Sequence, residues 1–329
     1  MSADVLSDVL RTVRLSGAVY FEFNVSPPWA FEAPASREIA AKVMPGAQRV
    51  IEYHLIARGS GWGNIAGQSP IRLQEGDLLV FPQGDAHVLR SALELPPILD
   101  MSIYTPPFTD LPLVYDRAAG EGEQSRILCC FLGCDETPFN PLLTSLPRVM
   151  HLPGSGDQAR SGWLGTLLHI ANSESGRPRA GGENVLARLS ELVFVEAIRR
   201  YLETLPADQT GWLAGLRDPM VGRALTALHQ DAGRPWTVEG LARVAGLSRS
   251  VFAQRFTGIV GHPPMQYLAL WRMQLAARLL ADGSGVAAVA EAVGYESEAA
   301  FSRTFKKLVG KAPGTWRRES NLQQEGRSG

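Results

Sequence analysis

The chain has 329 residues, and 45% hydrophobic and 20% charged residues are typical of a folded protein long enough for two domains. It has no apolar run near the ~18 residues of a membrane span and no basic-then-apolar leader, so we expect a cytoplasmic protein without a membrane partner. The three cysteines (Cys129, Cys130 and Cys134) are clustered and do not form a disulfide framework.

The formal net charge of −1 hides a separation of charge along the chain. Residues 219–318 carry 13 Lys and Arg against 6 Asp and Glu, whereas residues 1–218 carry 18 against 25. A basic segment attached to an acidic part indicates a module that binds a polyanion. A solvated helix surface would also explain the charge.

The N-terminal part begins with a predicted amphipathic helix at residues 4–13, after which the apolar period changes to two. Clusters of Pro, Gly, Ser and Asn bound the strand candidates, which are residues 19–23, 38–43, 49–56, 71–73, 77–81, 98–103 and 126–131. Residues 105–124 read as a loop rich in Pro, Gly and acidic residues. Many short strands predict an antiparallel sandwich or barrel.

The pattern becomes helical after Pro138, with helices predicted at residues 163–171 and 183–205. The second helix has a wider apolar set than a lone surface helix needs. It therefore packs either on both the barrel and a second chain or within one chain only. Residues 205–211 are the expected linker to the C-terminal part.

A duplicated unit dominates the C-terminal part. The spacing from Leu241 to Val289 is 48 residues and that from Ser248 to Ser297 is 49, so one residue is inserted in a turn, where insertions cost least. Each copy predicts a helix, a glycine turn and a second helix with two Phe on one face. Thr237 and Ser284 are the expected caps of the first helices, and Ser248 and Ser297 those of the second. Such helix pairs are typical of the helix-turn-helix motif. One copy alone would equally fit a generic helical hairpin.

The second copy resembles the DNA-binding domain of the AraC-type bacterial transcription regulators. The resemblance rests on Gly294-Tyr295-Glu296-Ser297, Phe301-Ser302-Arg303-Thr304-Phe305-Lys306, Gly310, Pro313 and Trp316-Arg317. It implies that one long helix, here residues 264–281, joins the two motifs. Such a spacer suits recognition helices that enter successive major grooves about 34 Å apart. The resemblance also implies double-stranded DNA, a small effector and RNA polymerase as partners, and a homodimer.

Positions on the second helix of each copy predict the contacts with DNA. The Phe pairs must pack inward, and by resemblance the outward N-terminal positions approach base edges. These positions are Arg249, Ser250, Ala253 and Gln254 in the first copy and Glu298, Ala299, Ala300, Ser302 and Arg303 in the second. Arg303 suits guanine and Gln254 suits adenine, whereas Glu298 selects cytosine, caps its helix or points away. The expected phosphate contacts are Ser248, Arg255, Arg272, Ser297, Lys306 and Lys307.

Residues 76–87 fit G-x5-P-x-G-x2-H and resemble the second motif of the cupin barrels. The first cupin motif is degenerate, with Glu52 in place of its first His, His54 retained and Arg58 or Gly59 at the place of its later Glu. Glu52 and His54 share one strand face, so with His87 they form a candidate two-His-one-carboxylate site for a divalent metal. Arg58 disfavours a cation, and a metal-free ligand pocket or plain packing is the alternative.

The resemblance to AraC-type regulators with a cupin sensor implies that the barrel binds the effector. Tyr53, His54, Trp62 and His87 are the expected pocket residues, together with Trp29, although aromatic residues on strands are more often core. Cys129 is a candidate soft ligand or, alternatively, a buried inert thiol.

The sequence thus predicts a multi-domain α+β protein that is a transcription regulator and no enzyme. The expected domains are residues 1–135, a cupin-like antiparallel β-barrel, residues 136–210, a helical dimerisation and linker region, and residues 211–320, an all-α domain with two helix-turn-helix motifs. The alternatives are a metal-dependent cupin enzyme with a DNA-binding tail and a DNA repair factor with an activated cysteine.

Overall fold

The computed structural model describes residues 4–13, 15–106, 112–117, 122–135, 137–154, 163–175, 179–206 and 208–328. Contacts divide the chain into two compact units. The sheet unit comprises Leu15–Asp135 and Leu146–Thr204, and the helical unit comprises Met1–Arg14, Glu136–Ser145 and Leu205–Gly329. One unit boundary falls after Asp135, as predicted, whereas the helical unit also contains Glu136–Ser145 and its C-terminal part begins at Leu205 rather than at residue 211.

Two short segments that we expected outside the C-terminal domain belong to the helical unit. One is α1 (Val5–Thr12), whose Val5 and Val9 are buried and which contacts α8 and α11. The other contains α3 (Pro141–Ser145), before which the Phe139 backbone N–H donates to Gln274 Oε1 at 2.9 Å. The division into two units therefore depends on buried contacts between residues far apart in the sequence. Composition does not reveal such contacts.

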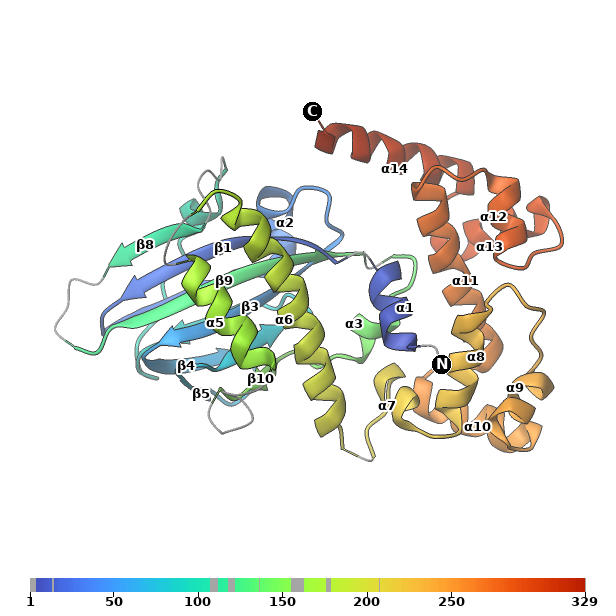
Figure 1. Cartoon of the computed structure of the whole chain (residues 1–329), viewed down its shortest axis with the longest axis horizontal. Helices are drawn as coiled ribbons and strands as arrows, with labels where there is room; N and C mark the ends of the chain where they lie inside the picture. Colours follow the sequence, from blue (N-terminus) through green and yellow to red (C-terminus); the bar gives the residue numbers. More distant parts are fainter. Residues whose placement is uncertain are drawn as a thin grey trace. The chain divides into compact units, whose positions relative to one another are not determined.

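The sheet unit contains two sheets (Figure 1). The six-stranded sheet has the order β10-β6-β3-β9-β1-β8, and the four-stranded sheet has the order β2-β7-β4-β5. The strands are β1 (Ser16–Val25), β2 (Ala30–Ala33), β3 (Arg49–Arg58), β4 (Ser60–Ile65), β5 (Ile71–Gln74), β6 (Leu78–Phe81), β7 (His87–Arg90), β8 (Leu113–Arg117), β9 (Ser125–Cys134) and β10 (Met150–Leu152).

The predicted antiparallel barrel needs correction, because the described strands form two separate sheets and no closed barrel is detected. All pairs are antiparallel except β1 with β8, which are parallel. The α+β class itself is confirmed. The short strands β2, β4, β7, β8 and β10 were not predicted, and β8 lies inside the segment that we expected to be a loop.

Two strand predictions are wrong. Residues 38–43 belong to the helix α2 (Ser36–Val43), because Ile39 and Val43 are four apart and both are buried on its inner face. Residues 98–103 contain only one β-bridge, at Ile98, and then the 3₁₀ helix η1 (Met101–Tyr104), which Asp100 caps. A window of six residues is too short to distinguish the apolar period of a helix from that of a strand.

Two helices complete the sheet unit, α5 (Trp163–Ser175) and α6 (Gly182–Thr204), and both were predicted. The helix α6 contacts α5 and the strands β1, β9 and β10. Tyr53 of β3 is hydrogen-bonded through its hydroxyl to Ser190 Oγ of α6 at 2.6 Å. Consequently α6 covers one face of the six-stranded sheet. The residues directly before and after Tyr53 on β3 face the other side.

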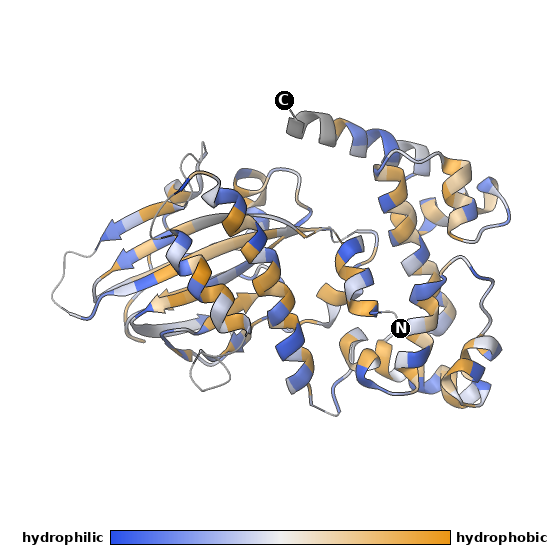
Figure 2. Ribbon diagram, in the orientation of Figure 1, coloured by the Kyte–Doolittle hydropathy of each residue, from blue (hydrophilic) through white to orange (hydrophobic). Residues whose placement is uncertain are grey.

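The helical unit is built around α11 (Pro264–Ala281), which has the predicted bounds and is predominantly apolar (Figure 2). Its other C-terminal helices are α7 (Trp212–Arg217), α8 (Val221–Gln230), α9 (Val238–Ala245), α10 (Arg249–Val260), α12 (Val286–Ala292), α13 (Glu298–Val309) and α14 (Pro313–Ser328). No helix in the described part of the chain is long and apolar enough to span a membrane.

Both copies of the duplicated unit form two helices joined by a short turn. Thr237 caps α9 by accepting from Gly240 N, while Ser248 and Ser297 cap α10 and α13. Gly246 and Gly294 adopt left-handed conformations with φ of 74° and 76°, which glycine adopts without strain. A Cβ on Gly294 would lie 2.0 Å from the Gly233 carbonyl oxygen, so close packing also requires glycine there.

One cap was predicted wrongly. Gly285 rather than Ser284 precedes α12, and no side chain caps that helix. The glycine-rich sequence around Gly283 lets the chain turn one residue later than the serine suggests.

Candidate DNA interface and ligand cavity

The second helices, α10 and α13, bury one face and expose the other. Their Phe pairs, at 252 and 256 and at 301 and 305, are 0% exposed. The predicted base-reading residues Arg249, Ser250, Gln254, Glu298 and Arg303 are exposed, whereas Ala253, Ala300 and Ser302 are partly buried. The helices therefore present polar side chains at their N-terminal ends on rigid, fully packed supports.

Among the predicted base contacts, Arg249 has a partner within the helical unit, and Glu298 has a position that stabilises its own helix. Arg249 Nε lies 2.8 Å from Glu239 Oε1, and both side chains remain mostly exposed. Glu298 lies in the first turn of α13, where a carboxylate stabilises the positive end of the helix dipole. Helix stabilisation is thus one role of Glu298.

The residues predicted to contact DNA phosphates differ in whether they already have partners within the protein. Lys306 and Lys307 are exposed in the last turns of α13. Arg255 pairs with Asp218, whose Oδ2 lies 3.1 Å from Arg255 Nε. Arg272 does not fit a phosphate contact: its guanidinium donates to the carbonyls of Ala232, Gly233 and Arg234, and burial lowers its pKa. The sequence pattern of the repeat could not reveal these carbonyls, because they lie about forty residues before Arg272 in the chain.

The sheet unit contains a cavity of about 210 Å³ on the side of the six-stranded sheet opposite Tyr53. Its walls carry seven aromatic rings, those of Phe21, Phe23, Trp29, Phe31, Tyr104, Tyr115 and Phe131. Phe23 stacks on Phe31 at 5.0 Å and on Tyr115 at 5.2 Å, each with an interplanar angle of 17°. The cavity is therefore largely apolar, with a polar floor of Glu52, His54 and Cys129.

Of the predicted pocket residues, the structure brings His54 and Trp29 to the cavity but not the other aromatics. Tyr53 faces α6, because neighbouring residues of a strand point to opposite faces. Trp62 of β4 lies beside Arg72 and is not among the lining residues. His87 lies behind the floor, stacked on Phe81 with ring centroids 3.6 Å apart.

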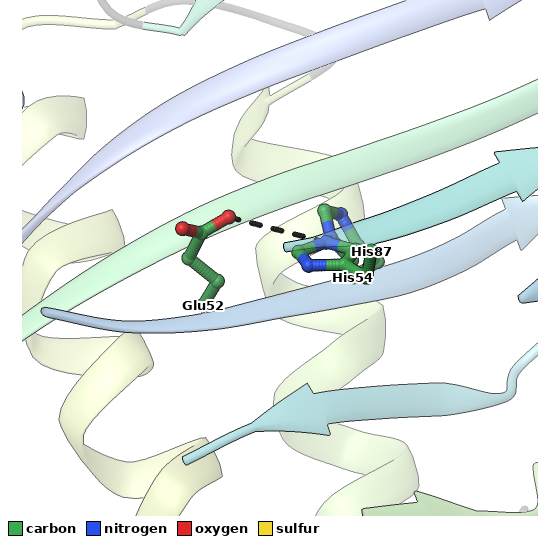
Figure 3. Close-up of side chains that lie close together, drawn as sticks. All are labelled: Glu52, His54 and His87. Atoms are coloured by element: carbon green, nitrogen blue, oxygen red, sulfur yellow. Dashed lines mark hydrogen bonds and ion pairs between the residues drawn. The ribbon is translucent and has the colours of Figure 1, made fainter. Parts of the chain in front are cut away.

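The floor is a chain of hydrogen bonds between neutral groups, of which Figure 3 draws the two imidazole rings. His87 Nδ1 donates to the Asp85 carbonyl, so its Nε2 accepts from His54 Nε2 at 2.5 Å. The remaining nitrogen of His54 then accepts from the Cys129 thiol at 2.8 Å. Burial raises the pKa of Cys129, lowers that of His54 well below its ordinary value and lowers that of His87 to about 4.

Glu52 lies beside this chain, with its carboxyl group turned toward the imidazole pair (Figure 3). Ser36 at the start of α2 donates to Oε1 at 2.6 Å. Burial raises the pKa of Glu52 to about 8, although the Ser36 hydrogen bond acts in the opposite direction. Glu52 is therefore a neutral carboxylic acid at pH 7, and its Oε2 has no hydrogen-bond partner among the described residues.

Glu52, His54 and His87 supply the residue types of a metal site, with ligand atoms within 4.8 Å of one another. Their geometry does not fit one ion. Two nitrogen ligands on a tetrahedral ion stand roughly 3.4 Å apart, since each bond is about 2.0–2.1 Å. Here the two Nε2 atoms are 2.5 Å apart and share a proton, while Glu52 Oε2 is 3.9 Å from His87 Nε2.

Most of the aromatic wall was missed by the sequence analysis. Phe21 and Phe23 alternate on β1, and Cys129 and Phe131 alternate on β9, so each pair shares one strand face. This alternation was available as a signal. No such signal existed for Tyr104, which follows the wrongly predicted strand at residues 98–103, or for Tyr115, which lies inside the segment expected to be a loop.

Comparisons with known proteins agree with these two features. Family models described as "Cupin" and "Helix-turn-helix domain" match residues 4–203 and 241–319. An AraC-like transcription regulator of Streptomyces lividans is 33% identical over 97% of this chain and 99% of its own length. The transcriptional regulator AlkR of Acinetobacter baylyi is 28% identical over 96% of this chain and 100% of its own.

A solved structure, the DNA-binding domain of AdpA in complex with a target DNA, is 30% identical and covers 33% of this chain and 97% of that one, with a TM-score of 0.31. The whole-length relative and the cupin match over more than half of the chain decide the family. The chain belongs to the AraC family of DNA-binding transcription regulators, with a cupin domain at its N-terminal end.

Proposed function

We propose that this chain is a ligand-controlled transcription regulator that reads DNA with two helix-turn-helix motifs, α9–α10 and α12–α13. One observation carries this proposal: both second helices bury their Phe pair completely and leave polar N-terminal residues exposed. Burial of this kind fixes a helix firmly enough to be presented to a groove. The match to a helix-turn-helix family model over residues 241–319 covers most of both pairs and supports it.

The helix α11 sets the distance between the two motifs. Its 18 residues span about 27 Å at 1.5 Å per residue, which is comparable with the ~34 Å between successive major grooves on one duplex face. One chain then reads two adjacent half-sites. Arg303 suits a bidentate contact with guanine and Gln254 one with adenine, because each presents two hydrogen-bonding groups.

Backbone contacts fall to the exposed cations of α13. Lys306 and Lys307 are free of ion pairs among the described residues and lie on the exposed side of the helix. We assign them, with the capping serines Ser248 and Ser297, to phosphates, which set affinity and salt dependence and not sequence. Arg255 joins them only if phosphate competes with Asp218.

The cavity is the effector site in this proposal. It is concave, mostly apolar and carries a few polar groups, which is the usual character of a small-molecule site. Its floor of neutral, mutually hydrogen-bonded side chains favours binding over catalysis, since it has no ionised base and no activated nucleophile. We therefore infer a regulator without enzymatic activity that acts on cytoplasmic DNA together with RNA polymerase.

We also propose that the site works without a metal ion. Binding an ion would require the His54–His87 hydrogen bond to open by almost 1 Å and Glu52 to lose its proton. Metal analysis of purified protein tests this, and a stoichiometric ion that is lost in His87→Ala would contradict it.

A homodimer is the proposed assembly. The described part of α5 and α6 exposes large apolar side chains, of which Val185 (42%) and Leu192 (44%) are seven residues apart and share a face of α6. A second copy of this chain would cover them, which agrees with the wide apolar set of this helix.

A mobility-shift assay with genomic fragments at moderate salt tests the proposed function. We expect one or more fragments to bind more tightly than random duplex of equal length, with an affinity that changes when the cavity is filled. Equal binding of all duplexes would contradict sequence-specific regulation.

A further inference from the structure

The size of the cavity, its aromatic rings, its charges and the unpaired polar atoms of its lining residues restrict the class of ligand that it can bind. We propose that it binds an uncharged, single-ring aromatic molecule with a carbonyl-type hydrogen-bond acceptor. This inference rests on the proposed function, which makes the cavity an effector site.

The volume sets the size of the ligand. A dry protein cavity of about 150 Å³ holds one benzene molecule. The present cavity of about 210 Å³ is roughly 1.4 times larger, so it accommodates about eight or nine non-hydrogen atoms. A benzene ring with a substituent of two or three atoms has this size, whereas a sugar chain or a dinucleotide does not fit.

The arrangement of the rings favours an aromatic ligand. Trp29, Phe31, Phe23 and Tyr115 form a continuous row of near-parallel rings, with interplanar angles of 17–24° between neighbours. Phe21, Tyr104 and Phe131 meet one another edge to face. An inserted ring can stack on the first group and meet the edges of the second, and such pairs are favourable beyond the area that they bury.

Charges around the cavity favour a neutral ligand. Among the described lining residues the only cation is Arg117, which is exposed and shares the lining with the carboxylates of Glu32 and Asp100. The floor contains neutral groups only. A charged group placed among the rings would lose its hydration without gaining a partner, which is costly.

Two unpaired polar groups favour a ligand with an acceptor. Trp29 and Ser26 are lining residues that are 7% and 6% exposed, and their indole N–H and hydroxyl are buried without a hydrogen-bond partner in the described part of the chain. A buried indole N–H is a donor only and normally finds an acceptor. A ligand carbonyl on this side of the cavity would satisfy it.

Four probes of equal non-hydrogen atom count separate these requirements in calorimetric titrations of the full chain. Acetophenone has every proposed feature, cumene lacks the acceptor, benzoate adds a charge, and cyclohexyl methyl ketone lacks the aromatic ring. We expect acetophenone to bind about fivefold more tightly than cumene, as one net hydrogen bond provides. Cyclohexyl methyl ketone should bind severalfold more weakly, and benzoate should bind weakest.

Trp29→Phe tests the acceptor contact in the protein. This variant keeps a ring and removes the indole N–H, so the ratio of acetophenone to cumene affinity should fall from about five to about one. Trp62→Phe is the matched control, because Trp62 lies outside the cavity lining, and it should retain the wild-type ratio. The probe series in wild-type protein stands independently if Trp29→Phe folds poorly.

Tightest binding by benzoate, equal binding by acetophenone and cumene, or no binding by any probe would overturn the proposed ligand class. Mobility shifts with and without acetophenone separate this inference from the proposed function. Ranked binding with an unchanged DNA complex would support the ligand class and contradict the effector role. A DNA complex that responds to another small molecule, but not to acetophenone, would contradict the ligand class alone.

Discussion

Glu52→Gln should make this protein more stable at neutral pH, although it removes a fully buried side-chain oxygen. Glu52 is 0% exposed, and burial raises its pKa from 4.5 to about 8 in the folded chain. In the unfolded chain the carboxyl ionises near its ordinary value. Its contribution to stability is therefore present below pH 4.5 and is lost as the pH rises toward 8.

The size of the effect follows from proton linkage. Between pH 5 and 7.5 the unfolded chain has released the proton that the folded chain keeps, so the free energy of unfolding falls by about 1.4 kcal/mol per pH unit, or about 3 kcal/mol in all. Glutamine is neutral at every pH and can still accept from Ser36. His54 and His87 titrate in both proteins and largely cancel in the difference.

Urea unfolding of the two proteins across this pH range, followed by circular dichroism in the presence of a chelator, measures the difference. We expect nearly equal stabilities at pH 4.5 and an advantage of Glu52→Gln that grows to about 3 kcal/mol at pH 7.5. A constant difference would mean that Glu52 is already ionised in the folded state. A variant that is less stable at pH 7.5 would indicate that the carboxylate is needed as an anion, and it would refute the neutral floor.

Three further predictions concern DNA and assembly. Arg303→Ala should relax preference at one base pair and cost about 1–3 kcal/mol of specific binding, which a binding selection would reveal as a changed consensus. Lys306→Ala should weaken all sites similarly and reduce the salt slope by about 1, as measured by titrations at several salt concentrations. Leu192→Glu should shift the protein toward monomer in analytical ultracentrifugation, because it places a charge in the proposed interface, and an unchanged sedimentation profile would contradict that interface.

The helical unit could be predicted from sequence in most details because its signals are local. Thr237, Gly246 and Ser248 determine where helices begin and end within a few positions of themselves. The repeat in the sequence supplied the second copy independently. Only Ser284 misled, since a flexible glycine beside it gave the chain another way to start α12.

The cavity could not be predicted as fully, because it depends on pairing between distant strands. Glu52 meets Ser36 and His54 meets Cys129 only after β3 pairs with β9 and α2 folds as a helix. Strand alternation alone would have excluded Tyr53 beside His54. Tyr104 belongs to η1 and Tyr115 to β8, two short elements that the sequence analysis did not predict.

Footprinting of the tightest-binding genomic fragment tests the two-motif account most directly. For each bound chain we predict two protected segments on one face of the duplex, centred about one helical turn apart, with Arg303→Ala weakening protection in one segment and Gln254→Ala in the other. A single protected segment, or loss of the same segment in both variants, would contradict reading by two helices that α11 holds at a fixed separation.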